Sequence, residues 1–598
     1  MAEEKKKKKS KKSKKDSEID GAEKKQELSQ QFKIAYRSLE NPRKFYLTIL
    51  LPLVILGLLI CIIPFILNMI LPHSMNFNLT TFIIGGVVPI FLGVLYPFIK
   101  WKGRENDINS KIHFFITHLR VLAISDLALK DIINILGGKK AYGALGEELK
   151  KISILSTQWR MPLSKSFRFV SARTPSKILK DFLDRFSQSL DSGVEHREFI
   201  EIEQEAVLQE YKTIYETSNE NVVILNEVYV SMLIAIMFVM TLGIVLPIIM
   251  GTEDMNMFIL LSSFLLIISE GMLMYLLRAM MPRDEIWHVT GEKGEIEEKI
   301  QRIFRLSIVL TIFVVALIIF GRYYLSIPIL QMIPFEILFA IAITPLMIVG
   351  IAVFIEEQNI ARKERSFLGF LPALGSISTM RGGKINDSVY YLSEKDYGVL
   401  TKHVRDLYRR LRTRINDDDA WEWFGVDTGS NYIQRSSEMF REATYAAANP
   451  RNVSRMIAEN MRKIRDLRVK KLTIVNTSIA LFGGITFGIS FAIYISLIIG
   501  RHLNTIVKDT GDPFASLGEN KINIGAILHY IDPSIYNYNF FIIFFVLVIH
   551  CLLLALTLRM MRGGHILVTL IYFVPFVWII SITSYIVEVS FGGMLNPG

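Results

Sequence analysis

Long apolar stretches alternate with two polar segments of more than a hundred residues each, and this alternation constrains the fold more than any short motif does. A helix needs about 20 mainly apolar residues to cross a bilayer core. On this criterion the sequence predicts an all-α, polytopic membrane protein with about nine transmembrane helices. We place them at 46–70, 80–99, 225–250, 257–277, 304–326, 333–355, 472–499, 540–559 and 565–589.

Lysine and arginine are distributed unequally among the segments that connect these spans. They are concentrated in the N-terminal tail, in 100–224, in 278–303, in 356–471 and in the turn at 559–562. The other connections hold only Arg322, Arg501, Lys508 and Lys521. By the positive-inside rule, we expect the N-terminus, both long segments and the basic loop 278–303 to be cytoplasmic. The loop 500–539 and the C-terminus at 590–598 are then external.

The net charge of +11 is therefore first a topology signal, and the basic residues are too dispersed to predict a nucleic-acid surface. The tail at 1–40 begins with a lysine run that repels itself, and we expect it to be disordered. It is interpreted either as a solvated topogenic tail or as a contact with anionic lipid headgroups or an acidic partner. Cys61 and Cys551 both lie in predicted spans and define no disulfide or metal framework.

Both polar segments are predicted to be helical bundles, at 100–224 and 356–471. Apolar residues recur at helical spacing in 127–136, in 175–193 and in 404–415, and neither segment shows sustained strand alternation. The pattern of two spans, one bundle and two spans occurs twice, and 114–136 is comparable with 367–392. This predicts a parallel internal repeat, a feature that some transporters also have.

Residues for catalysis are not recognisable in the sequence. It has no phosphate-binding loop of the G-x-x-x-x-G-K-[ST] type, no H-E-x-x-H and no paired C-x-x-C. We therefore expect no enzyme activity and predict no catalytic, cofactor-binding or metal-binding residue. If the protein works with ATP, a partner must bind the nucleotide.

A cluster of arginines between His403 and Phe424 is the most distinctive polar feature. Arg405, Arg409 and Arg412 fall on one helical face, and Arg410 and Arg414 fall on a neighbouring one. The cluster is either a solvated face or a docking surface for an acidic partner, since arginine suits interface ion pairs. The following run Asp417–Asp419 is well placed to cap the next helix.

Two ionisable residues lie inside predicted spans, Glu270 in the fourth and His550 in the eighth. Such residues are expensive in a membrane and are often functional. A proton relay would need a chain of them, so we interpret these two as isolated groups that face the bundle interior, each with a hydrogen-bond partner. A polytopic transporter with an internal repeat remains an alternative of a different class.

The second polar segment carries several motifs of a known family. They are FLPALGSI at 370–377, DYGVL at 396–400, AWEWFGVDTGSNYI at 420–433 and AAANPRNVSRMIAENM at 446–461. With the flanking spans, they resemble the archaeal branch of the type II secretion F-domain proteins. These are the membrane platforms of type IV pilus-like machines, and the resemblance is greatest to archaellum platforms.

The resemblance implies a platform without enzyme activity in the cytoplasmic membrane. A hexameric secretion ATPase would dock on the cytoplasmic segments, with Arg405, Arg409, Arg410, Arg412 and Arg414 as candidate contacts. Filament subunits, other motor components, membrane lipids and a second copy of the chain are the further partners implied. A platform for an archaeal adhesion pilus is the nearest alternative.

Relaying movement into the membrane requires stiff connections. The stretches 195–250 and 450–499 each consist of a charged segment that leads directly into a span, with no proline at the junction. We therefore predict continuous helix through Val222–Asn226 and through Val469–Thr473.

Overall fold

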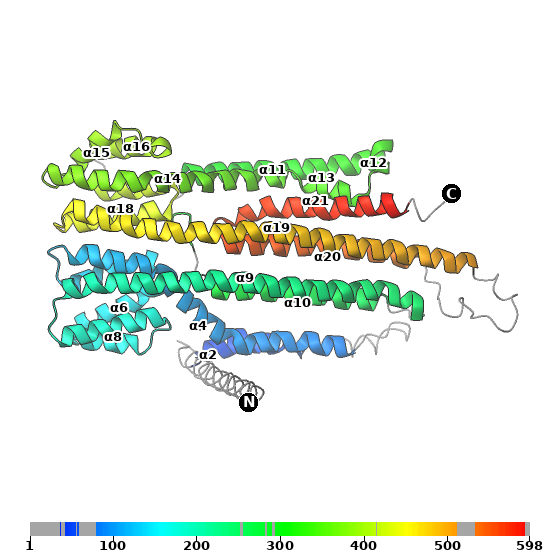
Figure 1. The fold of residues 1–598 in the computed structure, drawn as a ribbon, viewed down its shortest axis with the longest axis horizontal. Coiled ribbons are helices and arrows are strands. Elements are labelled where there is room, and N and C mark those ends of the chain that lie inside the picture. The colour runs from blue at the N-terminus through cyan, green and yellow to red at the C-terminus, as the bar shows by residue number, and fades with distance from the viewer. Residues whose placement is uncertain are drawn as a thin grey trace, which may run out of the picture.

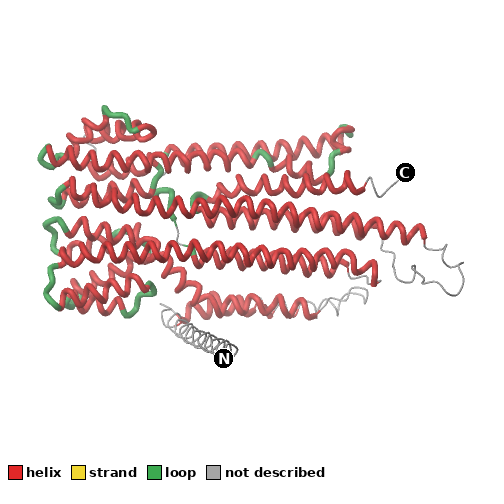
Figure 2. Tube along the Cα trace, in the orientation of Figure 1, coloured by secondary structure: helices red, strands yellow, loops and turns green. Residues whose placement is uncertain are grey.

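The computed structural model describes residue 36 and the ranges 42–55, 57–58, 62, 79–250, 255–281, 284–289, 294–413, 416–510 and 533–592. Within these residues the chain is helical and has no strand (Figure 2), which confirms the predicted all-α class. Its one β feature is an isolated bridge between Trp287 and Ser430. The lysine-rich tail and Cys61 lie outside the described residues.

Long helices lie side by side along the longest axis of the molecule (Figure 1). They are α4 (Leu79–Ala123), α9 (His196–Met250), α10 (Met255–Met280), α11 (Glu295–Ile319), α14 (Leu346–Met380), α19 (Pro450–Thr510), α20 (Pro533–Arg562) and α21 (Thr569–Val587). Shorter elements accompany them: α2 (Pro42–Phe45), η1 (Tyr46–Leu50), η2 (Lys140–Tyr142), η3 (Phe320–Tyr324), α12 (Pro328–Met332), α13 (Phe335–Ile343), η4 (Gly398–Leu400), η6 (Ile566–Val568) and η7 (Glu588–Gly592).

Two groups of four short helices gather at one end of the long helices. The first bundle consists of α5 (Leu129–Gly138), α6 (Ala144–Thr157), α7 (Leu163–Ser171) and α8 (Lys177–Asp191). The second bundle consists of α15 (Ile385–Ser393), α16 (Thr401–Arg412), α17 (Asp417–Thr428) and α18 (Asn431–Tyr445). The chain enters each bundle through one long helix, α4 or α14, and leaves it through another, α9 or α19.

Six described helices are long and apolar enough to cross a membrane, and the pair α13–α14 makes a seventh if it is one broken span. These seven match the predicted spans from 225–250 onward. The predicted span at 46–70 lies partly outside the described residues. Residues 80–99 belong to α4, whose 45 residues continue into the first bundle. The structure therefore supports a multi-pass protein, while the count of nine stays a prediction.

Proline breaks one span. Between α13 and α14 the chain bends by 42°, and Pro345 lies in this break with its carbonyl accepting a hydrogen bond from Ser307 Oγ (2.5 Å). A proline cannot donate the backbone hydrogen bond that a continuous helix needs. Pro575, by contrast, lies inside α21 without ending it.

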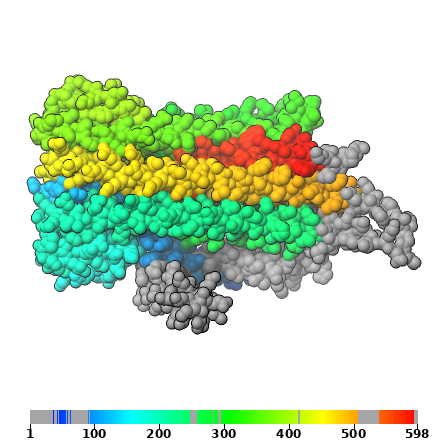
Figure 3. All heavy atoms as spheres, viewed as in Figure 1, coloured from blue at the N-terminus to red at the C-terminus, as the bar shows by residue number. Residues whose placement is uncertain are grey.

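The two junctions that were predicted to be continuous helix lie inside α9 and α19, which we call the lever helices. α9 contains 55 residues and α19 contains 61, and neither ends at the junction between its polar and apolar parts. At about 1.5 Å per residue, each is roughly 80–90 Å long. Figure 3 shows the two helices next to each other along one face of the molecule. Lys463 pairs with Glu205 (2.8 Å) and Lys470 with Glu216 (2.7 Å) across this contact.

The short helices form where the sequence patterns predict them. In α8, Ser176 caps the first turn by accepting a hydrogen bond from the backbone N–H of Leu179 (3.2 Å). The apolar residues of its periodic pattern are buried, among them Phe182 and Phe186. The helix ends before Gly193, whose φ of +75° suits a residue without a side chain.

Both bundles share one continuous hydrophobic core. Phe114 of α4 packs against Tyr432 of α18, with ring centroids 4.7 Å apart. A second cluster of buried residues fills the space among the apolar parts of the long helices. We call the chain up to the end of α10 the first unit and the chain from α11 onward the second unit. The helices of the two units follow the same order, as a duplication would produce, and the parallel repeat itself remains a prediction.

Candidate functional site: the junction of the two units

A short segment connects the two units and lies between them. We call residues 284–289 the strap, since they link α10 of the first unit to α11. The strap is hydrogen-bonded to the start of α18 in the second bundle: His288 N–H donates to the Gly429 carbonyl (3.1 Å), and Asn431 N–H donates to the Ile286 carbonyl (3.0 Å). The connection between units is thus fixed to the second bundle by its backbone.

Asp284 of the strap is held by both lever helices. Its carboxylate accepts hydrogen bonds from Tyr215 of α9 and from Lys471 of α19, each at 2.8 Å, and Arg468 Nε lies 3.8 Å away. Burial alone would raise the pKa of Asp284, but Lys471 and Arg468 outweigh it and lower the pKa to about 2. Asp284 is therefore an anion at neutral pH that joins the strap to α9 and α19.

Arg468 extends this network to α14 and α18. Its Nη1 lies 3.5 Å from a carboxylate oxygen of Glu364, and its guanidinium lies over the ring of Tyr432, 3.9 Å from the centroid. Glu364 in turn accepts a hydrogen bond from Ser430 Oγ (2.6 Å). Removing one member of such a buried network leaves the others uncompensated.

The strap also contacts the turn between α20 and α21. Trp287 Nε1 donates to Glu357 of α14 (3.2 Å), and the same carboxylate oxygen accepts from the backbone N–H of His565 (2.8 Å). Arg562 Nε lies 3.7 Å from the other oxygen of Glu357. The strap thus contacts α9, α14 and α19, and Glu357 connects it to the turn between α20 and α21.

Farther from the spans, ion pairs connect the two bundles directly. Lys139 of the first bundle pairs with Glu438 (2.6 Å) and with Glu442 of α18. His118 of α4 also contacts Glu442, with Nε2 at 3.1 Å. Burial would raise the pKa of Glu442, but His118 and Lys139 lower it to about 2. The bundles are therefore coupled electrostatically as well as through their common core.

The predicted arginine face is present on α16. Arg405, Arg409 and Arg412 are exposed, and among the described residues Arg409 pairs only with its neighbour Asp406 (3.1 Å). Arg410 points elsewhere and pairs with Asp427 at 2.6 Å. Arg414 lies outside the described residues. Three of the five arginines thus share an exposed face, and Arg410 is held by its own bundle.

The aspartate run after this helix has a different role from the one predicted. Asn416 is the N-cap of α17 and accepts a hydrogen bond from Asp418 N–H, while Asp417, Asp418 and Asp419 occupy the first turn. There they still favour the helix, because a negative charge stabilises the positive end of the helix dipole. Asp417 also accepts from Tyr445 (2.9 Å), which ties α17 to α18.

Glu270 and His550 face the bundle interior with hydrogen-bond partners, as expected, but the expectation that they are isolated from each other was wrong. His550 Nδ1 of α20 contacts the Glu270 carboxylate of α10, and Tyr229 of α9 donates to the same carboxylate (3.1 Å). Both ionisable side chains are fully buried. The pair connects the two units within the span region, far along the long helices from the strap.

Sequence reasoning missed the strap, because 278–303 was interpreted only as a basic loop. One signal was available: the loop contains an acidic pair, Asp284–Glu285, followed by Trp287 and His288. Aromatic and acidic residues are not needed in a solvated connection. The contacts that reveal their role, however, join positions far apart in the chain.

Comparisons with known proteins place this architecture in context. The family model described as type II secretion system (T2SS), protein F, matches residues 115–251. The match covers the first bundle and α9, whereas the motifs quoted above lie in the second polar segment. No solved structure matches.

Two curated relatives match almost the whole chain, and both are described as flagella accessory protein J. The protein from Methanococcus voltae is 33% identical over 93% of this chain and 97% of its own length. The protein from Methanocaldococcus jannaschii is 30% identical over 93% of this chain and 96% of its own length.

Proposed function

Because this chain belongs to the flagella accessory protein J family, we propose that it docks a hexameric secretion ATPase and relays ATP-driven movement to an archaellum filament. Membership of a family with the type II secretion F domain makes it a multi-pass membrane platform of an archaellum or type IV pilus-like machine. The docking, the relay and the filament's rotation are the proposal. Since both relatives are flagella accessory proteins, an archaellum is favoured over an adhesion pilus.

One observation carries the relay: α9 and α19 run without a break from the bundles into the span region, and Asp284 joins them. A force on either bundle would move a stiff helix rather than bend a loop. The strap then connects that movement to the other unit. A transporter would instead need unwound helices around a substrate site within the spans.

The direct test is affinity purification of the tagged protein from native membranes. We expect a hexameric secretion ATPase to be retained, together with filament subunits and other motor components, and a second copy of the chain to be recovered when two differently tagged copies are expressed. The absence of the ATPase after mild crosslinking would contradict the docking. As a control, an unrelated multi-pass protein with the same tag should retain none of them.

We also propose that the bundles are cytoplasmic and the C-terminus external, following the distribution of lysine and arginine. Single cysteines at the exposed positions Lys165 and Lys395, in a background lacking Cys61 and Cys551, can be probed with an impermeant thiol reagent. In intact cells we expect neither position to be labelled, whereas a cysteine at Asn596 should be. Labelling of either bundle in intact cells would reverse the orientation.

A further inference from the structure

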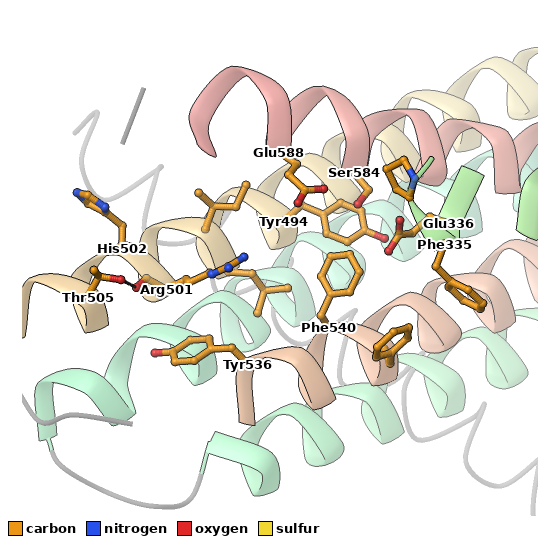
Figure 4. Close-up of a pocket in the computed structure, with 14 residues that line it drawn as sticks. Phe335, Glu336, Tyr494, Arg501, His502, Thr505, Tyr536, Phe540, Ser584 and Glu588 are labelled. Carbon is orange, nitrogen blue, oxygen red and sulfur yellow. Dashed lines mark hydrogen bonds between the residues drawn. The ribbon is translucent and has the colours of Figure 1, made fainter. Parts of the chain in front are cut away.

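A cavity of about 770 Å³ lies at the ends of the spans opposite to the bundles. α13, α19, α20 and α21 contribute its walls (Figure 4). In the proposed orientation this end faces the cell exterior. The volume falls within the range of about 300–1,000 Å³ that is typical of ligand sites.

Carboxylates and hydroxyl groups meet at one end of the cavity. Glu336, in the first turn of α13, is only 3% exposed, and Glu588 lies beyond the end of α21. The hydroxyl of Tyr494 is fully buried beside Ser584, which faces the same space. Figure 4 shows these side chains directed toward one another.

Neither carboxylate is neutralised by an ion pair within the described residues. Arg322 attracts the Glu336 carboxylate electrostatically, but its Nη1 donates to the backbone carbonyl of Ile333 (3.3 Å) and forms no ion pair with Glu336. A buried carboxylate is destabilising when no cation compensates its charge. This end of the cavity therefore offers carboxylate oxygens as hydrogen-bond acceptors for a positively charged donor.

Aromatic rings form the adjoining wall. Phe335 contacts Phe541 (centroids 5.5 Å apart), and Phe540 contacts Tyr494 (5.8 Å). Aromatic faces beside carboxylates favour an ammonium group, because the ring quadrupole attracts cations. The same rings suit an apolar body that carries the charge.

Arg501 and His502 lie at the other end of the cavity, further along α19, where Arg501 is exposed (Figure 4). The cavity is thus polarised, with carboxylates toward the spans and a cation toward the rim. A positively charged group is favoured at the carboxylate end and is repelled at the rim. An occupant with one positive end is therefore favoured in the orientation that places this end at the carboxylates.

We propose that this cavity receives the ammonium-bearing end of an apolar polypeptide segment from a membrane-embedded partner. The ammonium group would lie between Glu336 and Glu588, and the apolar segment would pack on Phe335, Phe540 and Phe541. The idea rests on the proposed function, in which an incoming filament subunit is the partner of this kind.

Binding can be measured with the full-length protein in nanodiscs and a designed probe. The probe is a fluorescent 20-residue Leu/Ala helix with a free N-terminal ammonium, compared with its N-acetylated form. We expect at least tenfold tighter binding of the free-amine probe, and we expect Glu336→Gln to abolish this preference. Glu227→Gln, which alters an exposed carboxylate on α9 away from the cavity, is the matched control and should keep it.

Equal affinity for the two probes, or a preference that survives both Glu336→Gln and Glu588→Gln, would overturn the proposal. Glu588→Gln keeps the test decisive if Glu336→Gln does not fold, since Glu588 is exposed. Loss of the preference only in discs made with aminolipids would assign the cavity to a lipid headgroup instead. ATPase co-purification is measured separately, so failure of this site and failure of the proposed function are distinguishable.

Discussion

The two bundles have the same helix order but different surfaces. α6 and α16 occupy equivalent places in that order, yet α6 carries Lys151 paired with Glu148 (3.1 Å), whereas α16 presents Arg405, Arg409 and Arg412 on an exposed face. Core positions determine how the helices pack, and surface positions are free to differ. We therefore propose that the ATPase binds mainly to the second bundle.

The two units also differ where they enter the membrane. α4 enters the first bundle as one helix, whereas the second unit enters through α13 and α14 with a 42° bend. α14 then packs closely on α21, where a Cβ added at Gly350 would lie 2.5 Å from the backbone nitrogen of Ile571. In the second unit, α21 is thus an additional helix that packs against the helix leading into the bundle.

The largest expected effect comes from interrupting the long helices α9 and α19 at their junctions with the spans. Three glycines inserted between Leu472 and Thr473 of α19, or between Val223 and Ile224 of α9, should abolish filament assembly, because glycine weakens a helix and adds freedom at the junction. Filaments counted by electron microscopy are the measurement. Membrane insertion and ATPase co-purification should be unchanged.

A matched insertion at the Gly382–Gly383 turn of the second bundle should be tolerated, since that turn already adopts positive φ values. Loss of assembly with the α19 insertion alone would assign the relay to the second unit. Normal assembly with both insertions would make the platform a passive anchor.

The next largest effect is expected from removing the Asp284 carboxylate, which joins the strap to α9 and α19. Asp284→Ala leaves Lys471 buried without its carboxylate and Arg468 with Glu364 alone, and we expect the free energy of unfolding to fall by about 3–5 kcal/mol. Thermal unfolding in detergent measures this change. Glu201→Ala removes an exposed partner of Arg120 and should cost less than about 1 kcal/mol. Equal melting temperatures for the two variants would mean that the strap does not hold the units together.

Acid should weaken the interface between the units before it affects the carboxylates. His113 of α4 lies at this interface, where its Nε2 is 3.1 Å from the hydroxyl oxygen of Tyr432 of α18. Burial, with Arg468 nearby, lowers the pKa of His113 to about 3. Because this value is below the unfolded pKa of about 6.5, the stabilisation is complete above pH 6.5 and is lost as the pH falls toward 3, by about 2 kcal/mol at pH 5. Glu442 and Asp284, whose pKa values are about 2, add to the loss only below about pH 4.5.

The second bundle offers a control for this pH dependence. Burial lowers the pKa of His403 to about 4, so its contribution equals that of His113 at pH 5 and is smaller only below about pH 4, by about 1 kcal/mol at pH 3. Melting temperatures at pH 7.5 and pH 3 should therefore depend less on pH in His113→Gln than in His403→Gln. The reverse order would show that the interface between units is not the acid-sensitive part.

The smallest expected effect concerns the surfaces. Reversing Arg405, Arg409 and Arg412 to glutamate should weaken ATPase binding about tenfold, since each exposed pair contributes up to about 1 kcal/mol. Reversing Lys130, Lys150 and Lys151 of the first bundle should change it less. Binding of the parent protein should weaken with salt, because exposed charges are screened within about 10 Å at 0.1 M. Equal losses in both variants would remove the distinction between the two surfaces.

Local features of this fold were predictable, and long-range pairings were not. The pattern of Ile178, Leu179, Phe182, Leu183 and Phe186 predicted α8 and its buried face, because helical periodicity is written in adjacent residues. The levers were predicted from charge and the absence of proline. Glu270 and His550, in contrast, are 280 residues apart, and no local pattern indicates that their spans are neighbours. The polar face of α16 was predictable, but the pairing of Arg410 with Asp427 was not.

The pairing of Asp284 with Lys471 has a consequence for biosynthesis. The two residues are separated by 187 positions, and ribosomes add about 5–20 residues per second. On the order of ten to forty seconds therefore pass between the synthesis of the strap and that of its partner. During this interval the residue that receives the strap does not yet exist. The contact between the strap and α19 can therefore form only late in the synthesis of the chain, after residue 471 has been added.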